Sequence, residues 1–183
     1  MCIRDSADTG AILYEKDAYE KCYPASTTKI LTGLLTIENS RLDDIVTFSS
    51  AAANSVTWED ASLATKAGEE YTVEQALYGL LLYSANEIAY GLAEHVGGTL
   101  SNFVDMMNKR AKELGLKNTN FKTPHGLDAA NHYSSARDMS TIAKELVKHE
   151  KVLEFTSVYE DYLRENTDRK ICLLYTSPSP RDA

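Results

Sequence analysis

The chain has 183 residues, of which 43% are hydrophobic and 25% are charged, with a formal net charge of −8. This length and apolar content suffice for one domain, or for one domain with two lobes. The acidic balance, with an isoelectric point of about 5.0, argues against nucleic acid as a partner, because phosphates require a basic surface. The sequence contains no apolar run of membrane-spanning length and no recognisable signal peptide.

The first part of the chain predicts two strands around a helix. A strand is expected over residues 11–15, and a helix that carries Ser26 is expected to extend to about Asn39. A short strand over residues 45–48 follows. Residues 55–68 are expected to form a loop that rims a site.

Residues 24–29, with the sequence PASTTK, place a hydroxyl and an amine at helical spacing. Ser26 and Lys29 share one face of the expected helix, with Ser26 in its first turn behind Pro24. Free backbone donors and the positive end of the helix dipole suit a nucleophile there. Lys29 is the only charged residue within residues 22–37, so burial is expected to lower its pKa toward that of a base. The alternative is a capped helix whose lysine extends to solvent.

A second set of short polar residues, Ser84 to Asn86, separates two predicted helices. Residues 72–75 fit a capping box that opens the first helix, and a second helix is expected from Glu87 onward. At this break, Ser84 would relay a proton between Lys29 and a leaving amine, and the Asn86 amide would orient Lys29 and a substrate carbonyl. The alternative is an ordinary turn built from serine and asparagine.

The second half of the chain predicts two amphipathic helices and one strand. The first helix covers residues 101–114, with methionines that pack in the core, and ends at Gly115 as its C-cap. The next helix opens at Ser135 and continues through Val147, and residues 156–163 are expected to form a strand.

Cysteine and histidine spacing predicts no metal site and no cofactor. Cys22 lacks a C-x-x-C partner, and we expect a small buried thiol rather than a reactive one. His125 is expected to shape its loop rather than to transfer protons.

Four ordered matches give the chain a resemblance to the serine-type D-alanyl-D-alanine carboxypeptidases, which are low-molecular-weight penicillin-binding proteins of the peptidase S11 family. S-x-x-K and S-x-N occur in the order found in penicillin-binding proteins and class A β-lactamases. The opening strand at residues 8–15 and the HGLD loop with its following stretch, at residues 121–128 and 132–138, resemble the carboxypeptidases. Class A β-lactamases lack that last pair. The resemblance extends from about Asp8 to Lys170.

The resemblance implies a two-step acyl transfer on peptidoglycan stem peptides that end in D-Ala-D-Ala. Ser26 is the implied nucleophile, Lys29 the general base, Ser84 the proton relay, and Asn86 the residue that orients lysine and substrate. β-Lactam antibiotics would acylate the same serine. Two alternatives remain open: a non-catalytic remnant that binds penicillin or peptidoglycan, and a β-lactamase or endopeptidase relative.

The implied fold is mixed α/β (α+β), with a helical lobe against an antiparallel sheet and the site between them. The third family motif, K-T-G, has no counterpart in the sequence, because Lys122 and Thr123 are followed by Pro124. We therefore interpret the chain as a piece that stops before the K-T-G strand, and we expect weak or no turnover. An unpaired sheet edge and an uncovered apolar face predict poor solubility or self-association.

Both ends of the chain depart from the family pattern. Residues 1–6 and residues 171–183 are interpreted as sequence that does not belong to the family. They flank a partial peptidase domain at residues 7–170. A genuine flexible tail is the alternative. The resemblance implies an extracytoplasmic location, in the periplasm or on the outer face of the cytoplasmic membrane, with membrane attachment only through a C-terminal anchor outside the chain.

Overall fold

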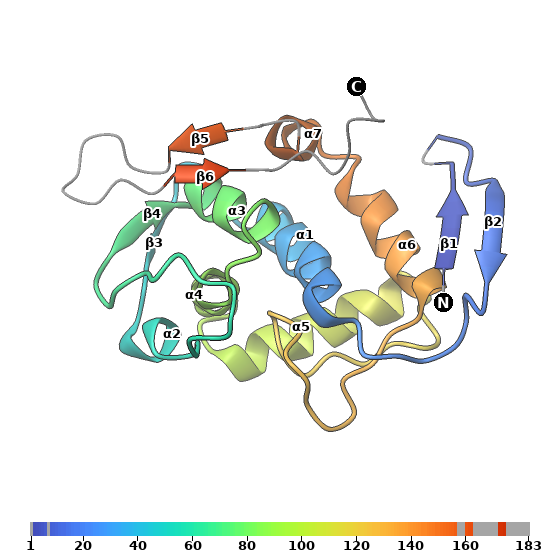
Figure 1. Ribbon diagram of the computed structural model, residues 1–183, viewed down its shortest axis with the longest axis horizontal. Coiled ribbons are helices and arrows are strands. Elements are labelled where there is room, and N and C mark those ends of the chain that lie inside the picture. The colour runs from blue at the N-terminus through green and yellow to red at the C-terminus, as the bar shows by residue number, and fades with distance from the viewer. Residues whose placement is uncertain (1, 7, 157–159, 163–171, 175–183) are drawn as a thin grey trace.

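The computed structural model describes residues 2–6, 8–156, 160–162 and 172–174, and it has a mixed α+β architecture (Figure 1). Helices surround α1, and three two-stranded antiparallel sheets lie around them (Figure 1). The sheets pair β1 with β2, β3 with β4, and β5 with β6. This confirms the expected fold class.

The elements of the described residues follow in chain order. The helices are the 3-10 turn η1 Ala25–Thr28, α1 Lys29–Asn39, α2 Ser50–Ala53, α3 Val73–Leu81, α4 Asn86–Gly97, α5 Leu100–Glu113, α6 Ala136–Leu146 and α7 Glu150–Thr156. The strands are β1 Cys2–Asp5, β2 Ile12–Lys16, β3 Ile45–Thr47, β4 Glu70–Thr72, β5 Glu160–Tyr162 and β6 Cys172–Leu174.

Helix α1 is central because apolar side chains cover it almost all round. Its residues Leu31 and Leu34 are fully buried in one cluster with Phe103 and Met107 of α5 and Ile142 of α6. A second cluster packs α3 and α4 against the β3–β4 sheet, where the rings of Phe48 and Tyr71 meet edge to face at 5.1 Å. Helix α1 therefore lies between two cores, and Met107 lies in the core as predicted.

Local capping signals place the helices that border the site. Thr72 and Gln75 form the predicted capping box of α3, with bonds in both directions. The Ser135 hydroxyl accepts a hydrogen bond from the Asp138 N–H at the start of α6. Gly115 follows α5 with φ +73°, as expected for a residue that ends a helix.

Several elements differ from the expectations. Ser26 lies in a 3-10 turn that precedes α1 rather than in the α-helix itself. Helices α2 and α7 and strands β1, β4 and β6 were not expected. Thr156 ends α7 instead of starting a strand. Strand β5 lies within the range expected to be a strand, residues 156–163. Residues 157–159 and 163 of that range fall outside the described residues.

The β1–β2 hairpin leaves apolar side chains uncovered. All of β2 is exposed, and its Leu13 side chain remains 67% exposed. Such a face is available for pairing with another chain, so self-association stays a prediction. In the part of the chain that the structure describes, no helix is both long and apolar enough to cross a bilayer.

Candidate active site

The amine of Lys29 is the centre of a buried polar cluster. Its Nζ lies 3.3 Å from Ser26 Oγ, 2.6 Å from Asn86 Oδ1 and 2.9 Å from the main-chain oxygen of His125. Lys29 is only 2% exposed, whereas Ser26 is exposed. The cluster therefore combines a solvent-exposed hydroxyl with a buried amine, as a base-activated nucleophile requires.

Burial changes the acid strength of this amine. Desolvation lowers the Lys29 pKa from 10.5 to about 8, and the carboxylates of Asp60 and Glu87 oppose part of that shift. At pH 7, about a tenth of a lysine with this pKa is uncharged and able to accept a proton.

The HGLD loop is docked directly against the turn that carries Ser26. Gly126 has φ +91°, and a Cβ built on it would lie 1.9 Å from the main-chain oxygen of Ala25. Ala25 itself has a positive φ of +47°, an unusual conformation for a residue with a side chain. Thr32 Oγ1 donates to the Pro124 carbonyl at 2.6 Å, which ties the loop to α1. The strained turn and the glycine contact together fix the position of Ser26, the predicted nucleophile.

His125 contributes to the site mainly through its backbone. Burial, followed by the neighbouring Lys29 charge, lowers the His125 pKa to about 4, so its ring is neutral at neutral pH. Its Nδ1 accepts a hydrogen bond from the Leu127 N–H at 3.1 Å. These contacts agree with the expected role in loop structure.

Asn86 connects Lys29 to a residue that the sequence did not single out as part of the site. While Asn86 Oδ1 faces Lys29, its Nδ2 donates to Asp60 Oδ1 at 3.2 Å. Asp60 lies in the loop over residues 55–68, which was expected only to rim the site. Its carboxylate was missed because the contact joins segments that show no common sequence pattern.

Ser84 precedes Asn86 by two residues. The residue is half-buried and adopts a positive φ of +63° at the break between α3 and α4. Within the described residues, no hydrogen bond joins its hydroxyl to Ser26 or Lys29. The structure thus brings Ser26, Lys29 and Asn86 together, and the role of Ser84 stays a prediction.

Cys22 fits a structural thiol. Its Sγ lies 3.5 Å from the Ser134 carbonyl oxygen, and burial raises the thiol pKa, which disfavours the reactive thiolate. It is half-buried, not fully buried as expected. The described residues hold no group of three or more His, Cys, Asp or Glu side chains arranged to bind a metal.

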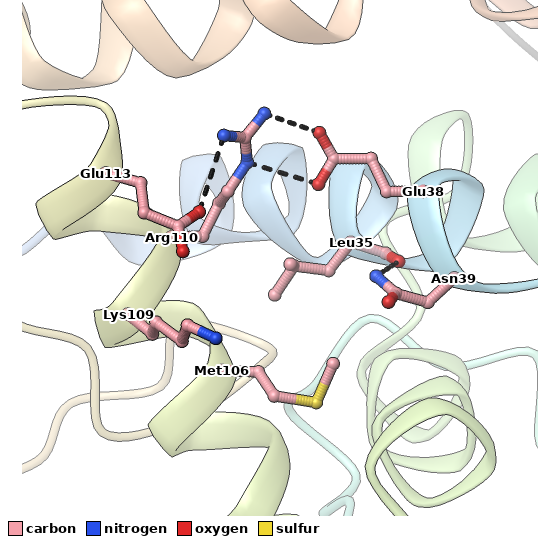
Figure 2. A pocket seen from close by; sticks show the side chains of 7 residues that line it. All are labelled: Leu35, Glu38, Asn39, Met106, Lys109, Arg110 and Glu113. Atoms are coloured by element: carbon pink, nitrogen blue, oxygen red, sulfur yellow. Dashed lines mark hydrogen bonds and ion pairs between the residues drawn. The ribbon is translucent and has the colours of Figure 1, made fainter.

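A separate pocket of about 160 Å³ lies between α1 and α5, away from the lysine cluster (Figure 2). Arg110 crosses it and pairs with Glu38 at 2.6 Å and with Glu113 at 3.6 Å (Figure 2). Three of its four charged side chains, Arg110, Glu38 and Glu113, pair with one another across the contact between the two helices.

The sequence profile of the family described as D-alanyl-D-alanine carboxypeptidase, peptidase S11, matches residues 2–177. The chain belongs to this family. The curated S11 relative DacF of Bacillus subtilis is 46% identical over 175 residues, which cover 93% of this chain and 44% of the relative. DacA of Haemophilus influenzae is 36% identical, over 77% of this chain and 37% of the relative. The chain thus spans less than half the length of these carboxypeptidases.

Solved structures support the S11 assignment. Penicillin-binding protein 5 of Haemophilus influenzae matches with a TM-score of 0.82 at 32% identity, over 94% of this chain and 50% of that one. The Streptomyces K15 DD-transpeptidase matches with a TM-score of 0.85 at 29% identity, over 94% of this chain and 71% of that one. These matches confirm the DD-peptidase-like fold. The S11 profile also covers residues assigned above to foreign ends, and that assignment stays a prediction.

Proposed function

We propose that the chain carries the part of a D-alanyl-D-alanine carboxypeptidase active site that forms the acyl-serine intermediate. Such an enzyme trims peptidoglycan stem peptides and binds β-lactams. The observation that carries the proposal is the position of the Lys29 amine, buried and 3.3 Å from Ser26 Oγ, with its pKa lowered to about 8. The S11 family assignment supports the same chemistry.

The proposed reaction has two steps. Uncharged Lys29 accepts the Ser26 proton as Oγ attacks the carbonyl carbon of the penultimate D-alanine. The carbon–nitrogen bond then breaks, and the proton passes through Ser84 to the nitrogen of the leaving D-alanine. Water next attacks the acyl-serine and regenerates Ser26. Asn86 holds both the lysine and the substrate carbonyl during these steps.

The proposed partners follow from this reaction. They are stem peptides ending in D-Ala-D-Ala and β-lactam antibiotics, whose strained amide presents a similar carbonyl to Ser26. We infer an extracytoplasmic location, in the periplasm or at the outer face of the cytoplasmic membrane, since peptidoglycan lies there.

A second candidate function is penicillin or peptidoglycan binding without turnover. It concerns the residues of this chain, in which no Lys-Thr-Gly or Lys-Ser-Gly occurs; the resemblance implies that this motif holds the substrate carboxylate. This candidate predicts slow acylation with no release of D-alanine.

Labelling with a fluorescent penicillin tests the proposal. We expect a covalent label on the wild type and on Ser101→Ala, which alters an exposed serine of α5, but none on Ser26→Ala. Label that persists on Ser26→Ala would remove Ser26 from the mechanism. D-alanine release from a peptide ending in D-Ala-D-Ala then separates the carboxypeptidase from the non-catalytic candidate.

A further inference from the structure

The loop segment over residues 60–65 runs along the start of α4 and is bonded to it at several points. The Asn86 N–H donates to the Ala61 carbonyl at 2.9 Å. The N–H groups of Leu63 and Thr65 donate to Glu87 Oε1 at 2.7 Å and 3.4 Å. This loop is therefore fixed to the helix that presents Asn86.

Glu87 is an unusual residue to find at this place. Its side chain is fully buried, and its Oε2 has no hydrogen-bond partner among the described residues. Burying a carboxylate with one unsatisfied oxygen is unfavourable for folding. Its contacts to the loop therefore indicate a role in holding residues 60–65 in place.

Asp60 is held rigidly at the beginning of that segment. Its Oδ2 accepts hydrogen bonds from the Thr57 N–H at 2.7 Å and from the Thr57 hydroxyl at 2.9 Å. Its Oδ1 accepts from Asn86 Nδ2 at 3.2 Å. A carboxylate can only accept hydrogen bonds, so Asp60 pairs with the NH₂ group of the Asn86 amide. The amide oxygen of Asn86 then faces Lys29.

We propose that Asp60 is a positioning residue for the Ser26–Lys29 pair: it fixes the orientation of the Asn86 amide, and Glu87 holds the loop that carries it. The inference rests on the proposed function because it assigns Lys29 as the base. Without Asp60, the amide is free to turn its donor end toward the lysine, which would repel the ammonium and misplace the amine.

The charges around Lys29 make this arrangement measurable. Asp60 and Glu87 both raise the Lys29 pKa against the larger effect of burial, and the nearby His125 ring is neutral at neutral pH. Asp60→Asn removes one of the two carboxylates while keeping a group of the same shape. The Lys29 pKa should therefore fall further below its wild-type value of about 8.

The first test follows Lys29 by NMR in protein labelled at the lysine ε-carbons, with the signal assigned through Lys29→Arg. Asp44→Asn is the matched control, because Asp44 Oδ2 likewise accepts the N–H three residues earlier, from Arg41 at 2.8 Å, and is likewise half-buried. We expect a lower titration midpoint in Asp60→Asn and an unchanged one in Asp44→Asn. An unchanged midpoint in Asp60→Asn would overturn the proposal.

The second test separates positioning from charge. At a pH above the Lys29 midpoint, Asp60→Ala should acylate with a fluorescent penicillin about tenfold more slowly than the wild type, a loss typical of one hydrogen bond to a charged group. Asp60→Asn, which keeps an acceptor for Asn86, should recover most of that rate. Equal rates for Asp60→Ala and wild type would overturn the positioning role.

A third readout does not depend on activity. If the wild type is not labelled at all, the proposed function fails, and exchange of the Asn86 side-chain amide protons decides the positioning role instead. We expect slow exchange in the wild type and faster exchange in Asp60→Ala. Equal exchange in both would contradict the proposal. If Asp60→Ala does not fold, the same comparison is made with Asp60→Asn, where intermediate exchange is expected.

Discussion

The main-chain oxygen of His125 lies 2.9 Å from Lys29 Nζ, although 96 positions separate the two residues. A carbonyl can accept a hydrogen bond from the lysine whether the amine is neutral or charged. The HGLD loop thus gives the buried amine of Lys29 a hydrogen-bond acceptor in both of its protonation states. This is the condition under which the lysine can cycle between base and acid.

Acylation of Ser26 should depend on pH in the way that the Lys29 pKa dictates. In the proposed mechanism only the uncharged amine removes the serine proton, so the rate of labelling by a fluorescent penicillin should rise with pH and level off above a midpoint near 8. Lys29→Ala should show no label at any pH while keeping its circular dichroism spectrum. A rate that is flat between pH 6 and 9 would contradict this assignment.

The same buried amine should make stability depend on pH. The folded-state pKa of Lys29, about 8, is below the ordinary value of 10.5, so the unfolded chain binds more protons between these values and stability rises with pH there. We expect Lys29→Met to gain up to about 3 kcal/mol in free energy of unfolding relative to wild type below pH 8, with the gain shrinking toward pH 10. Urea unfolding of both proteins across this range measures the difference. A constant difference would show that Lys29 is charged in the folded protein throughout.

Gly126 should tolerate no side chain. Gly126→Ala would place a Cβ against the Ala25 oxygen at a backbone φ of +91°, so we expect a loss of about 3 kcal/mol or more in stability and loss of penicillin labelling. Gly115→Ala is the control, since its φ is +73° but nothing lies within 4 Å of the added Cβ. That variant should lose only about 1 kcal/mol and keep its labelling. Similar losses in both variants would mean that the loop contact with Ala25 is unimportant.

The exposed strand β2 should promote self-association. Leu13 and Tyr14 are 67% and 53% exposed, on a strand whose far edge lacks a partner among the described strands. Leu13→Lys should therefore shift the protein toward the monomer in light scattering. Leu127→Lys, which changes another exposed leucine outside the sheet, should leave the distribution unchanged. A wild type that is monomeric at high concentration would refute the prediction.

The sequence predicted the parts of the site that depend on local spacing. Ser26 and Lys29 are one helical turn apart, so their contact requires only that the segment be helical. The capping box of Thr72 and Gln75 is likewise a local signal, and it placed α3 correctly. Ser26 lies in a 3-10 turn instead of α1 because Ala25, packed against Gly126, adopts a positive φ just before it.

The remaining parts depend on contacts between distant segments. Asp60 meets Asn86 across 26 positions, and Glu87 meets Leu63 across 24, with no periodic pattern that links either pair. Helix α2 has only four residues, too few to produce a hydrophobic period, although its N-cap Ser49 was a usable signal. Such features follow from tertiary packing, which one sequence does not display.

Direct titration of Lys29 in the folded wild-type protein, by NMR of the lysine ε-carbons, tests the central claim most directly. We predict a midpoint near pH 8 that is absent from Lys29→Arg. A midpoint near the ordinary 10.5 would show that the amine stays protonated at neutral pH, and Lys29 would then not be the base that activates Ser26.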